Sequence, residues 1–471
     1  MFTRRNFLKT ASMASAGLAL GGMELNAASY RQVVGANEKV NLACVGIGFQ
    51  GGGIIKEFAK TGLANVVALC DVDLGAKHTQ EIMAMFPKAK LFKDFRVMFD
   101  RMGNEFDAVS AGIPDFAHYP VAIHAILSGK HIYVEKPLCR TFNEAELLIA
   151  AARKYPKIVT QMGNQGHSGA NYFQFKAWKE AGIIKDVTSV TAYMNQPRRW
   201  HGWDSRIYKY PEAEPIPAGM DWDTWNMAVQ YHEYNDRYHR GNWRCWYDLG
   251  MGALGDWGAH LIDTVHQFLE LGLPYEVDPV MLKEHNDYFF PMSTTLKFRF
   301  AARKNMPALD INWYDGLDNV PPLPEGFGGV ASDPNIPNVA GEAYKSSNKN
   351  PGKVIYSKEL TFQGESHGSP LSIIPEAKAK EFASKLPTVP ESPSNHYANF
   401  LLACLGKEQT RSPFEISGPL SQVFCLGVIA QRLNRKLEFD VKTGQITNNP
   451  FANALLAGIP PRKGWEDYYK I

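Results

Sequence analysis

The chain has 471 residues, 45% of them hydrophobic and 21% charged, with a formal net charge of +2 at pH 7. This length exceeds what one ordinary hydrophobic core accommodates, so two domains and a processed terminus are expected. The near-neutral charge gives no indication of binding to nucleic acid or to an anionic membrane surface.

The N-terminus has the three parts of a signal peptide: a basic head, the weakly apolar run TASMASAGLALGGM, and small residues at Ala27 and Ala28. Arg4 and Arg5, followed by NFLK, resemble the twin-arginine motif, which directs folded proteins out of the cytoplasm. The apolar run is too short to span a bilayer of about 30 Å, so no membrane anchor is expected. We predict a signal peptide at 1–28, a linker at 29–38, a periplasmic location and the twin-arginine export machinery as a partner. The alternative is an amphipathic or disordered head.

The six cysteines lie far apart and form no CxxC pair: Cys44, Cys70, Cys139, Cys245, Cys404 and Cys425. This spacing argues against a disulfide framework despite the expected export. The histidines and carboxylates likewise show no recognisable metal signature, so we predict no metal.

Residues 39–162 alternate short apolar segments with amphipathic ones. The predicted strands are VNLACVG, NVVALCD, FDAVSAG, HIYVEK and KIVTQM, and the predicted helices are GGIIKEFAKTG, a stretch ending near Phe86, AHYPVAIHAILSG and NEAELLIAAARKY. Doubly apolar strands separated by helices are typical of a parallel sheet covered on both faces. We therefore predict an α/β fold that begins with a doubly wound, Rossmann-type domain.

The pattern changes beyond residue 162 to longer alternating segments such as TSVTAYMNQ and STTLKFRFA. These predict a second, α+β domain at 163–445 with a large, mainly antiparallel sheet. Its segment 314–370, rich in Gly, Pro, Asn and Ser, is expected to be an irregular insertion. HYANFLLACLG and PLSQVFCLGVIAQRLN have helical periodicity and should pack back on the body, before a tail at 446–471.

The run GIGFQG directly follows the first predicted strand and opens the first predicted helix. Gly46 permits a tight turn, Gly48 lets the backbone approach a pyrophosphate, and Gly51 allows close helix packing. Phe49 and Gln50 complete the loop. The pattern predicts a dinucleotide site, whereas the alternative is a set of glycines that only make a turn.

Asp71 ends the second predicted strand, where its carboxylate can accept hydrogen bonds from the adenine ribose hydroxyls. The same carboxylate repels a 2′-phosphate, and the following Val72 and Asp73 offer no arginine to hold one. NAD is therefore predicted as the cofactor, in preference to NADP.

Two groups of polar residues are candidates for the chemistry. Lys136, in HIYVEKPL, follows a strand of the predicted parallel sheet at the edge where ligands lie, and can stabilise an alkoxide. In GMGALGDWGAHLIDTVHQFLELG, Asp256, His260 and Gln267 share one helical face, so His260 can take a hydroxyl proton. Taken singly, each group is also compatible with a solvated lysine or an ordinary i,i+4 pair.

These motifs together, with AGIPDFAHYPVAIHAILSGKHIYVEKPL, GDWGAH, HYANFLLACLGKE and the closing GW near Trp465, resemble the glucose-fructose oxidoreductase, inositol dehydrogenase and MocA family, written Gfo/Idh/MocA. The resemblance implies a sugar, inositol or polyol substrate and a homo-oligomer, a dimer or a tetramer. It places Lys136, Asp256 and His260 at the catalytic positions. The cofactor positions that it implies are Pro114, His118, Glu135 and Gln165.

Seven of the ten tryptophans lie between Trp200 and Trp257, interleaved with charged residues. Aromatic faces edged by polar groups suit sugar rings, although such tryptophans also build cores. The candidate substrate residues are Arg198, Trp200, His201, Trp243 and Arg244.

The main hypothesis is an NAD-dependent oxidoreductase that oxidises a secondary hydroxyl of a sugar, glycoside or polyol, with a tightly bound cofactor recycled in the site. One alternative is a glycosidase that uses NAD for oxidation, elimination, hydration and reduction without net redox change. Another is a non-catalytic sugar-binding protein.

Overall fold

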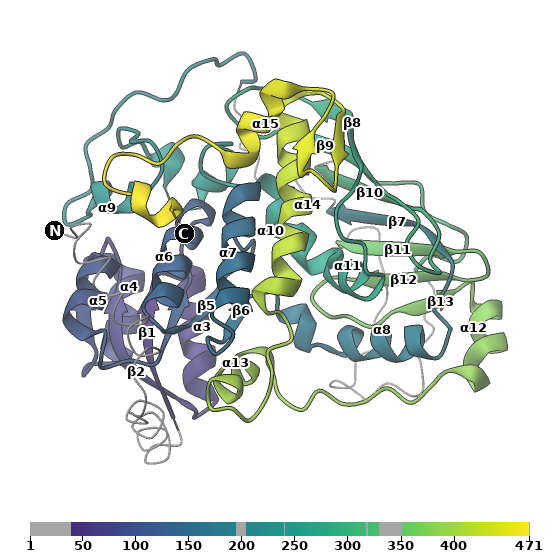
Figure 1. Cartoon of the computed structure of the whole chain (residues 1–471), viewed down its shortest axis with the longest axis horizontal. Coiled ribbons are helices and arrows are strands. Elements are labelled where there is room, and N and C mark those ends of the chain that lie inside the picture. Colours follow the sequence, from purple (N-terminus) through teal and green to yellow (C-terminus); the bar gives the residue numbers. More distant parts are fainter. Residues whose placement is uncertain (1–38, 195–203, 240, 317–318, 329–350, 471) are drawn as a thin grey trace, which may run out of the picture.

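A computed structural model represents the protein, and it describes residues 39–194, 204–239, 241–316, 319–328 and 351–470 (Figure 1). The predicted signal peptide and linker, at 1–38, lie outside the described residues. The same is true of the candidate substrate residues Arg198, Trp200 and His201.

The first domain is built on a six-stranded sheet in which every neighbouring pair of strands is parallel. Its strands are β1 (Val40–Val45), β2 (Ala64–Cys70), β3 (Lys90–Phe92), β4 (Ala108–Ala111), β5 (His131–Val134) and β6 (Thr160–Met162), in the order β3-β2-β1-β4-β5-β6. The order reverses between β1 and β4, and a crevice beyond the carboxyl ends of the strands opens at such a point. The predicted doubly wound domain is confirmed.

Side chains of β1 alternate between the two faces of this sheet, as the period of two requires. Val40, Leu42 and Cys44 join one hydrophobic cluster, and Ala43 and Val45 join the other. The first cluster is covered by α3, α4 and α13, and the second by α5, α6 and α7. These helices are α3 (Phe49–Lys60), α4 (Lys77–Met85), α5 (Phe95–Met102), α6 (Asp115–Leu127), α7 (Phe142–Lys154) and α13 (His396–Cys404).

The sequence pattern does not reveal β3 or α5. β3 has only three residues, too few to display a period. The N-terminus of α5 is capped by Asp94, whose carboxylate accepts a hydrogen bond of 2.8 Å from the N–H of Arg96. Its inner face, which includes Phe95, Met98 and Phe99, is buried, so tertiary packing completes a helix of eight residues.

The second domain contains a nine-stranded mixed sheet in the order β13-β12-β11-β7-β10-β9-β8-β14-β15. β7 and β10 are parallel and the other described pairs are antiparallel, which confirms the predicted, mainly antiparallel sheet. The strands are β7 (Val187–Met194), β8 (Glu276–Lys283), β9 (Ser293–Phe300), β10 (Leu309–Gly316), β11 (Gly352–Ser357), β12 (Thr361–Glu365), β13 (Ser372–Ile374), β14 (Leu437–Asp440) and β15 (Gln445–Ile446).

Within segment 314–370, the described residues 351–370 are more regular than the composition suggests, which corrects the expectation of an irregular insertion for that part. β11 and β12 lie within it, and β11 pairs with β7, so that Ile355 is opposite Val190. Val354, Ile355 and Phe362 are fully buried. Long-range pairing and burial therefore form strands that the Gly- and Pro-rich surroundings conceal.

Helix α14 joins the two domains. It contacts α7 of the first domain and α10 and β8 of the second, and in Figure 1 it stands between the two sheets. None of the described helices combines the length and the apolar character needed to cross a bilayer. The remaining helices are α8 (Ala170–Glu180), α9 (Trp222–Asn226), α10 (Gly252–Leu261), α11 (Asp263–Phe268), α12 (Glu376–Phe382), α14 (Phe414–Leu433) and α15 (Pro450–Ala457), with 3-10 turns η1 (Gln165–Ser168), η2 (Asp236–Tyr238), η3 (Asn242–Cys245), η4 (Ala383–Lys385) and η5 (Glu466–Tyr469).

Candidate active site

The turn between β1 and α3 requires glycine at Gly46 and Gly51, where a Cβ would collide with backbone atoms. Gly46 has φ of +77°, and a Cβ on it would lie 2.4 Å from the carbonyl oxygen of Gly112. A Cβ on Gly51 would lie 2.1 Å from the carbonyl oxygen of Gly46. One on Gly48 would lie 2.5 Å from the ring of His78. The backbone thus lies bare at the N-terminus of α3, where helix N–H groups and the helix dipole favour a phosphate.

Asp71 lies beside this turn at the end of β2. Its Oδ2 accepts a hydrogen bond of 2.9 Å from the N–H of Ile47, and its Oδ1 accepts one of 3.0 Å from the N–H of Asp73. Burial raises the pKa of the Asp71 carboxyl, and these two N–H groups oppose the rise. The carboxylate is therefore oriented before any ligand arrives, next to the position where a ribose would lie.

A cavity of about 600 Å³ extends from the glycine turn to α10 in the second domain. Its lining includes Gly46, Gly48, Phe49, Gln50 and Asp71. Lys136, Asp256 and His260 line the same cavity. A volume of this size accommodates a cofactor-sized ligand. The glycine turn, the oriented carboxylate and the cavity together fit a nicotinamide dinucleotide.

Lys136 and Asp256 form the central ion pair of the cavity, although 120 residues separate them in the chain. The Nζ of Lys136 donates to Asp256 Oδ1 at 2.7 Å and to the Asp256 carbonyl oxygen at 2.8 Å. The Nε of Arg244 lies 3.7 Å from the same Oδ1. Because the Asp256 side chain is only 5% exposed, these two cations compensate a carboxylate that water hardly reaches.

His260 lies one helical turn after Asp256 on α10 and is buried. Burial lowers the pKa of its imidazole well below the ordinary value, the charges of Lys136 and His367 lower it further, and Asp256 opposes them. His260 is therefore neutral near pH 7 and can accept a proton.

Glu135 is buried at the floor of the cavity, where burial raises the pKa of its carboxyl to about 7. Its Oε1 lies 3.4 Å from the hydroxyl of Tyr133 and accepts a hydrogen bond of 3.3 Å from Gln165 Nε2. A Cβ on Gly163 would lie 2.4 Å from the same oxygen. The fold thus brings together Glu135, which follows β5, and Gln165, which begins the turn η1, and both line the cavity.

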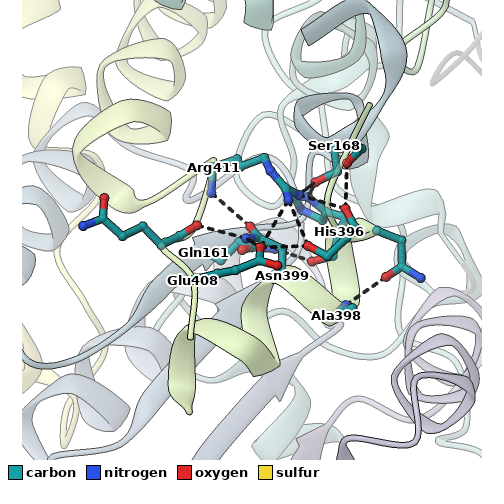
Figure 2. Close-up of polar contacts among 11 residues, drawn as sticks. Gln161, Ser168, His396, Ala398, Asn399, Glu408 and Arg411 are labelled. Atoms are coloured by element: carbon teal, nitrogen blue, oxygen red, sulfur yellow. Dashed lines mark hydrogen bonds and ion pairs between the residues drawn. The ribbon is translucent and has the colours of Figure 1, made fainter. Parts of the chain in front are cut away.

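A polar network anchors η1, which carries Gln165 (Figure 2). His396 connects η1 to β6, because its Nε2 lies 2.9 Å from the carbonyl oxygen of Met162 and its Nδ1 lies 3.1 Å from Ser168 Oγ. Arg411 Nη1 donates to the same Ser168 Oγ at 2.7 Å. His396, on α13, and Arg411, just before α14, therefore position η1 and with it the cavity residue Gln165.

His118 is not among the residues that line the cavity and lies behind its wall. Its Nδ1 lies 2.6 Å from the carbonyl oxygen of Pro137, and its Nε2 lies 2.8 Å from that of Ile113. Burial lowers its pKa to about 4. His118 thus supports the backbone next to Lys136, whereas Pro114, at the N-terminus of α6, lines the cavity.

The predicted helical face that carries Gln267 is interrupted. α10 ends at Leu261 and α11 begins at Asp263, and Gln267 does not line the cavity. The change of element at Ile262 ends the helical spacing that aligned Gln267 with Asp256 in the sequence.

Of the candidate substrate residues within the described part of the chain, Trp243 and Arg244 line the cavity. The guanidinium of Arg244 lies 4.0 Å from the centroid of the Trp243 ring, a cation–π contact that fixes both side chains. Trp225 and Trp257 also line the cavity, whereas Trp222 and Trp246 are buried in the core. The tryptophan-rich segment therefore contributes both to the cavity wall and to the hydrophobic core.

His367 is a cavity residue that the sequence pattern does not reveal. Its ring stacks on that of His260, with the ring centroids 3.8 Å apart and an angle of 23° between the planes. Its backbone N–H donates a hydrogen bond of 3.3 Å to the His260 carbonyl oxygen. It belongs to the segment expected to be irregular, where a histidine between Ser366 and Gly368 is the only cue. Within the described residues, no group of three or more His, Cys, Asp or Glu side chains is placed to hold a metal ion.

The first domain matches the model of an oxidoreductase family with an NAD-binding Rossmann fold over residues 40–162, and residues 183–290 match the α/β C-terminal domain of the same family. An alpha-N-acetylgalactosaminidase of Shewanella oneidensis is 29% identical over 34% of this chain and 39% of its own length. A glycosyl hydrolase family 109 protein of Saccharopolyspora erythraea is 25% identical over 47% of this chain and 55% of its own length.

Among solved structures, the WlbA dehydrogenase of Bordetella pertussis, in complex with NADH and UDP-GlcNAcA, is similar with a TM-score of 0.54 at 13% identity, over 86% of this chain and 99% of that one. At this identity the likeness shows the fold alone. The two family models match the first domain and residues 183–290 of the second, in chain order, and these ranges include the glycine turn, Asp71, Lys136, Asp256 and His260. The chain therefore belongs to the Gfo/Idh/MocA oxidoreductase family, and its first domain is an NAD-binding Rossmann domain.

Proposed function

We propose that the protein is an NAD-dependent enzyme that oxidises a secondary hydroxyl group of a sugar, glycoside or polyol. One observation carries the proposal: the 2.7 Å ion pair of Lys136 and Asp256 and the buried His260 line the same cavity as the glycine turn. A proton acceptor and a cation thus share one cavity with the predicted cofactor site.

When bound, NAD supplies a hydride acceptor for the carbon that carries the hydroxyl group. His260 accepts the hydroxyl proton, because its imidazole is neutral at physiological pH. Lys136 donates a hydrogen bond to the oxygen as negative charge develops on it. Asp256 holds the Nζ of Lys136 through its carboxylate and its carbonyl oxygen, so the ammonium group is oriented in advance.

The cavity walls support a carbohydrate as the substrate. Trp225, Trp243 and Trp257 present aromatic surface, and Arg244 and His239 add polar groups to the same lining. Sugar rings have apolar CH faces and hydroxyl rims, and a wall of this kind complements both.

A second candidate function is an NAD-using glycosidase with no net redox change. The names of the relatives favour it, since one is an alpha-N-acetylgalactosaminidase and others are glycosyl hydrolase family 109 proteins. The alignments cover 39% to 55% of these relatives' length, and both candidates share the oxidation step.

The test uses purified protein with its native cofactor content and a panel of free sugars, polyols and glycosides. Absorbance at the reduced nicotinamide band and product identity are followed together. Reduction with intact glycosidic bonds supports the dehydrogenase, and free sugar without net reduction supports the glycosidase. If no substrate gives either reduced nicotinamide or a product, the result supports a non-catalytic sugar-binding protein and refutes the proposal.

Two variants and one control connect the activity to the site. Lys136→Ala and His260→Ala should abolish turnover while NAD stays bound. Lys60→Ala is the control, because Lys60 is an exposed residue of α3 whose ion pair with Glu57 is also exposed. Normal turnover in either cavity variant removes that residue from the mechanism.

We also propose that the protein is exported by the twin-arginine route and works in the periplasm with a tightly bound, recycled cofactor. The sequence Arg4-Arg5 supports the route, and the six free cysteines, all of them among the described residues, are compatible with folding in a reducing compartment. Replacing both arginines by lysine should retain the protein in the cytoplasm, as cell fractionation would show. We further propose a homo-oligomer, which light scattering of the purified protein would test.

A further inference from the structure

We propose that His367 is a further catalytic residue of this site, an acid that protonates an oxygen leaving the substrate at the rim of the cavity. The inference rests on the proposed function, because the leaving oxygen must lie next to a position activated by oxidation. It assigns the second imidazole of the cavity to a step that simple dehydrogenation does not contain.

The loop between β12 and β13 holds His367 firmly in place. The N–H of Asn171, on α8, donates to the Gly368 carbonyl oxygen at 2.9 Å. The backbones of Gly169 and Gly368 approach so closely that a Cβ on Gly169 would lie 3.0 Å from the Gly368 Cα. Ser366 Oγ lies 2.8 Å from the Nδ1 of His367. The imidazole is therefore a fixed part of the cavity wall.

The two stacked imidazoles have different environments. His260 is 5% exposed and lies on the buried face of α10, whereas His367 is exposed at the rim. Burial disfavours the charged form of His260 most, the charges of Lys136 and His367 disfavour it further, and Asp256 favours it. Two positively charged rings with centroids 3.8 Å apart would repel each other, so the pair holds one proton at a time. That proton lies on His367, because burial disfavours a charge on His260.

This asymmetry separates two roles in one site. The buried imidazole is the base for the hydroxyl proton, and the exposed one exchanges protons with solvent. Titratable groups whose environments differ in this way are the usual means of placing a base and an acid side by side.

The leaving oxygen departs by elimination. The substrate has a carbonyl group next to a C–H, and the following carbon carries the leaving oxygen. The C–H electron pair becomes the second bond between the two carbons, and its proton passes to solvent. The bond to the leaving oxygen breaks with its electron pair on that oxygen, and the proton of His367 forms the new O–H bond. When water adds in the reverse sense, it returns a proton to His367.

The test compares two glycosides of the same sugar, one with a nitrophenol and one with an alkyl alcohol as the leaving group. His367→Asn is the main variant, because asparagine tolerates the positive φ of 56° at this position and has no acidic proton. His367→Phe is the second variant and retains a ring to stack on His260. An acid contributes about 10²–10⁴-fold, and mainly to the poorer leaving group.

We expect both variants to lose about 10²-fold or more on the alkyl glycoside and about tenfold or less on the nitrophenyl glycoside. They should retain bound NAD and wild-type exchange of the C–H proton with deuterium from solvent. Equal losses on the two glycosides, or loss of the exchange, would overturn the acid role. Wild-type protein that oxidises sugars without cleaving either glycoside refutes the inference and leaves the proposed function intact. A wild type inactive towards every substrate refutes both.

Discussion

The ion pair of Lys136 and Asp256 gives a prediction that separates stability from catalysis. Lys136→Met removes the ammonium group whose Nζ lies 2.7 Å from Asp256 Oδ1, and leaves a carboxylate that is 5% exposed. Breaking a buried pair from one side costs about 3–5 kcal/mol. The Lys136 side chain is 13% exposed and Arg244 remains 3.7 Å from the carboxylate, so we expect about 2 kcal/mol, below that range.

A second substitution tests the cause of this loss. Asp256→Asn in the Lys136→Met background removes the uncompensated charge, so most of the lost stability should return. Activity should not return, because the cation that stabilises the developing alkoxide is still missing. As for Lys136→Ala, we expect both variants to lose turnover, with rates lower than that of the wild type by at least about 10²–10³-fold.

The assay is urea unfolding of the wild type, the two single variants and the double variant at one saturating NAD concentration, because bound cofactor itself stabilises the folded state. Initial rates on the best substrate are measured in parallel. If the double variant is no more stable than Lys136→Met, the isolated carboxylate is not the cause of the loss. If Lys136→Met is as active as the wild type, the proposed role of Lys136 is wrong.

Three further predictions concern the cofactor turn and acid stability. Gly46→Ala should lose bound NAD, measured as nicotinamide released on heating, because its Cβ would lie 2.4 Å from a carbonyl oxygen; Gly62→Ala, with φ of +71° and nothing within 4 Å, is the control and should keep its NAD. Asp71→Asn should narrow the preference for NAD over NADP by about tenfold in calorimetric titrations, because one negative charge facing a 2′-phosphate is lost. The melting temperature should fall as the pH is lowered from 6.5 to 4. Histidines of the unfolded chain bind protons at a pKa of 6.5, whereas burial keeps several imidazoles of the folded protein neutral until about pH 4 or below. Two buried carboxyls with pKa raised to about 7, Glu135 and Asp315, act in the opposite direction, but the histidines with lowered pKa are more numerous. A constant melting temperature across this pH range would therefore contradict the prediction. The histidines concerned are His118, His124, His131, His266 and His396.

The sequence by itself determines the cofactor domain, because the signals there are local. A strand, a glycine turn and a helix follow one another within about twenty residues, and two of the glycines are required by backbone contacts inside that unit or with Gly112, which follows the neighbouring strand β4. Gly46 and Gly51 show this, since a Cβ on either would collide with the backbone of the turn or of Gly112. Doubly apolar strands likewise identify a parallel sheet without any knowledge of its neighbours.

Only the tertiary structure brings the reacting groups together, because their contacts join distant parts of the chain. Lys136, which follows β5, and Asp256, on α10, meet across 120 residues. No sequence periodicity identifies His367, because it lies in a loop and not in a helix or strand. Close backbone contacts at Gly368 hold this loop so that the His367 ring stacks on His260. His118 shows the converse: the resemblance placed it at the cofactor, but packing of α6 places it behind the cavity wall. Local sequence specifies elements, whereas the positions of side chains between domains depend on how those elements pack.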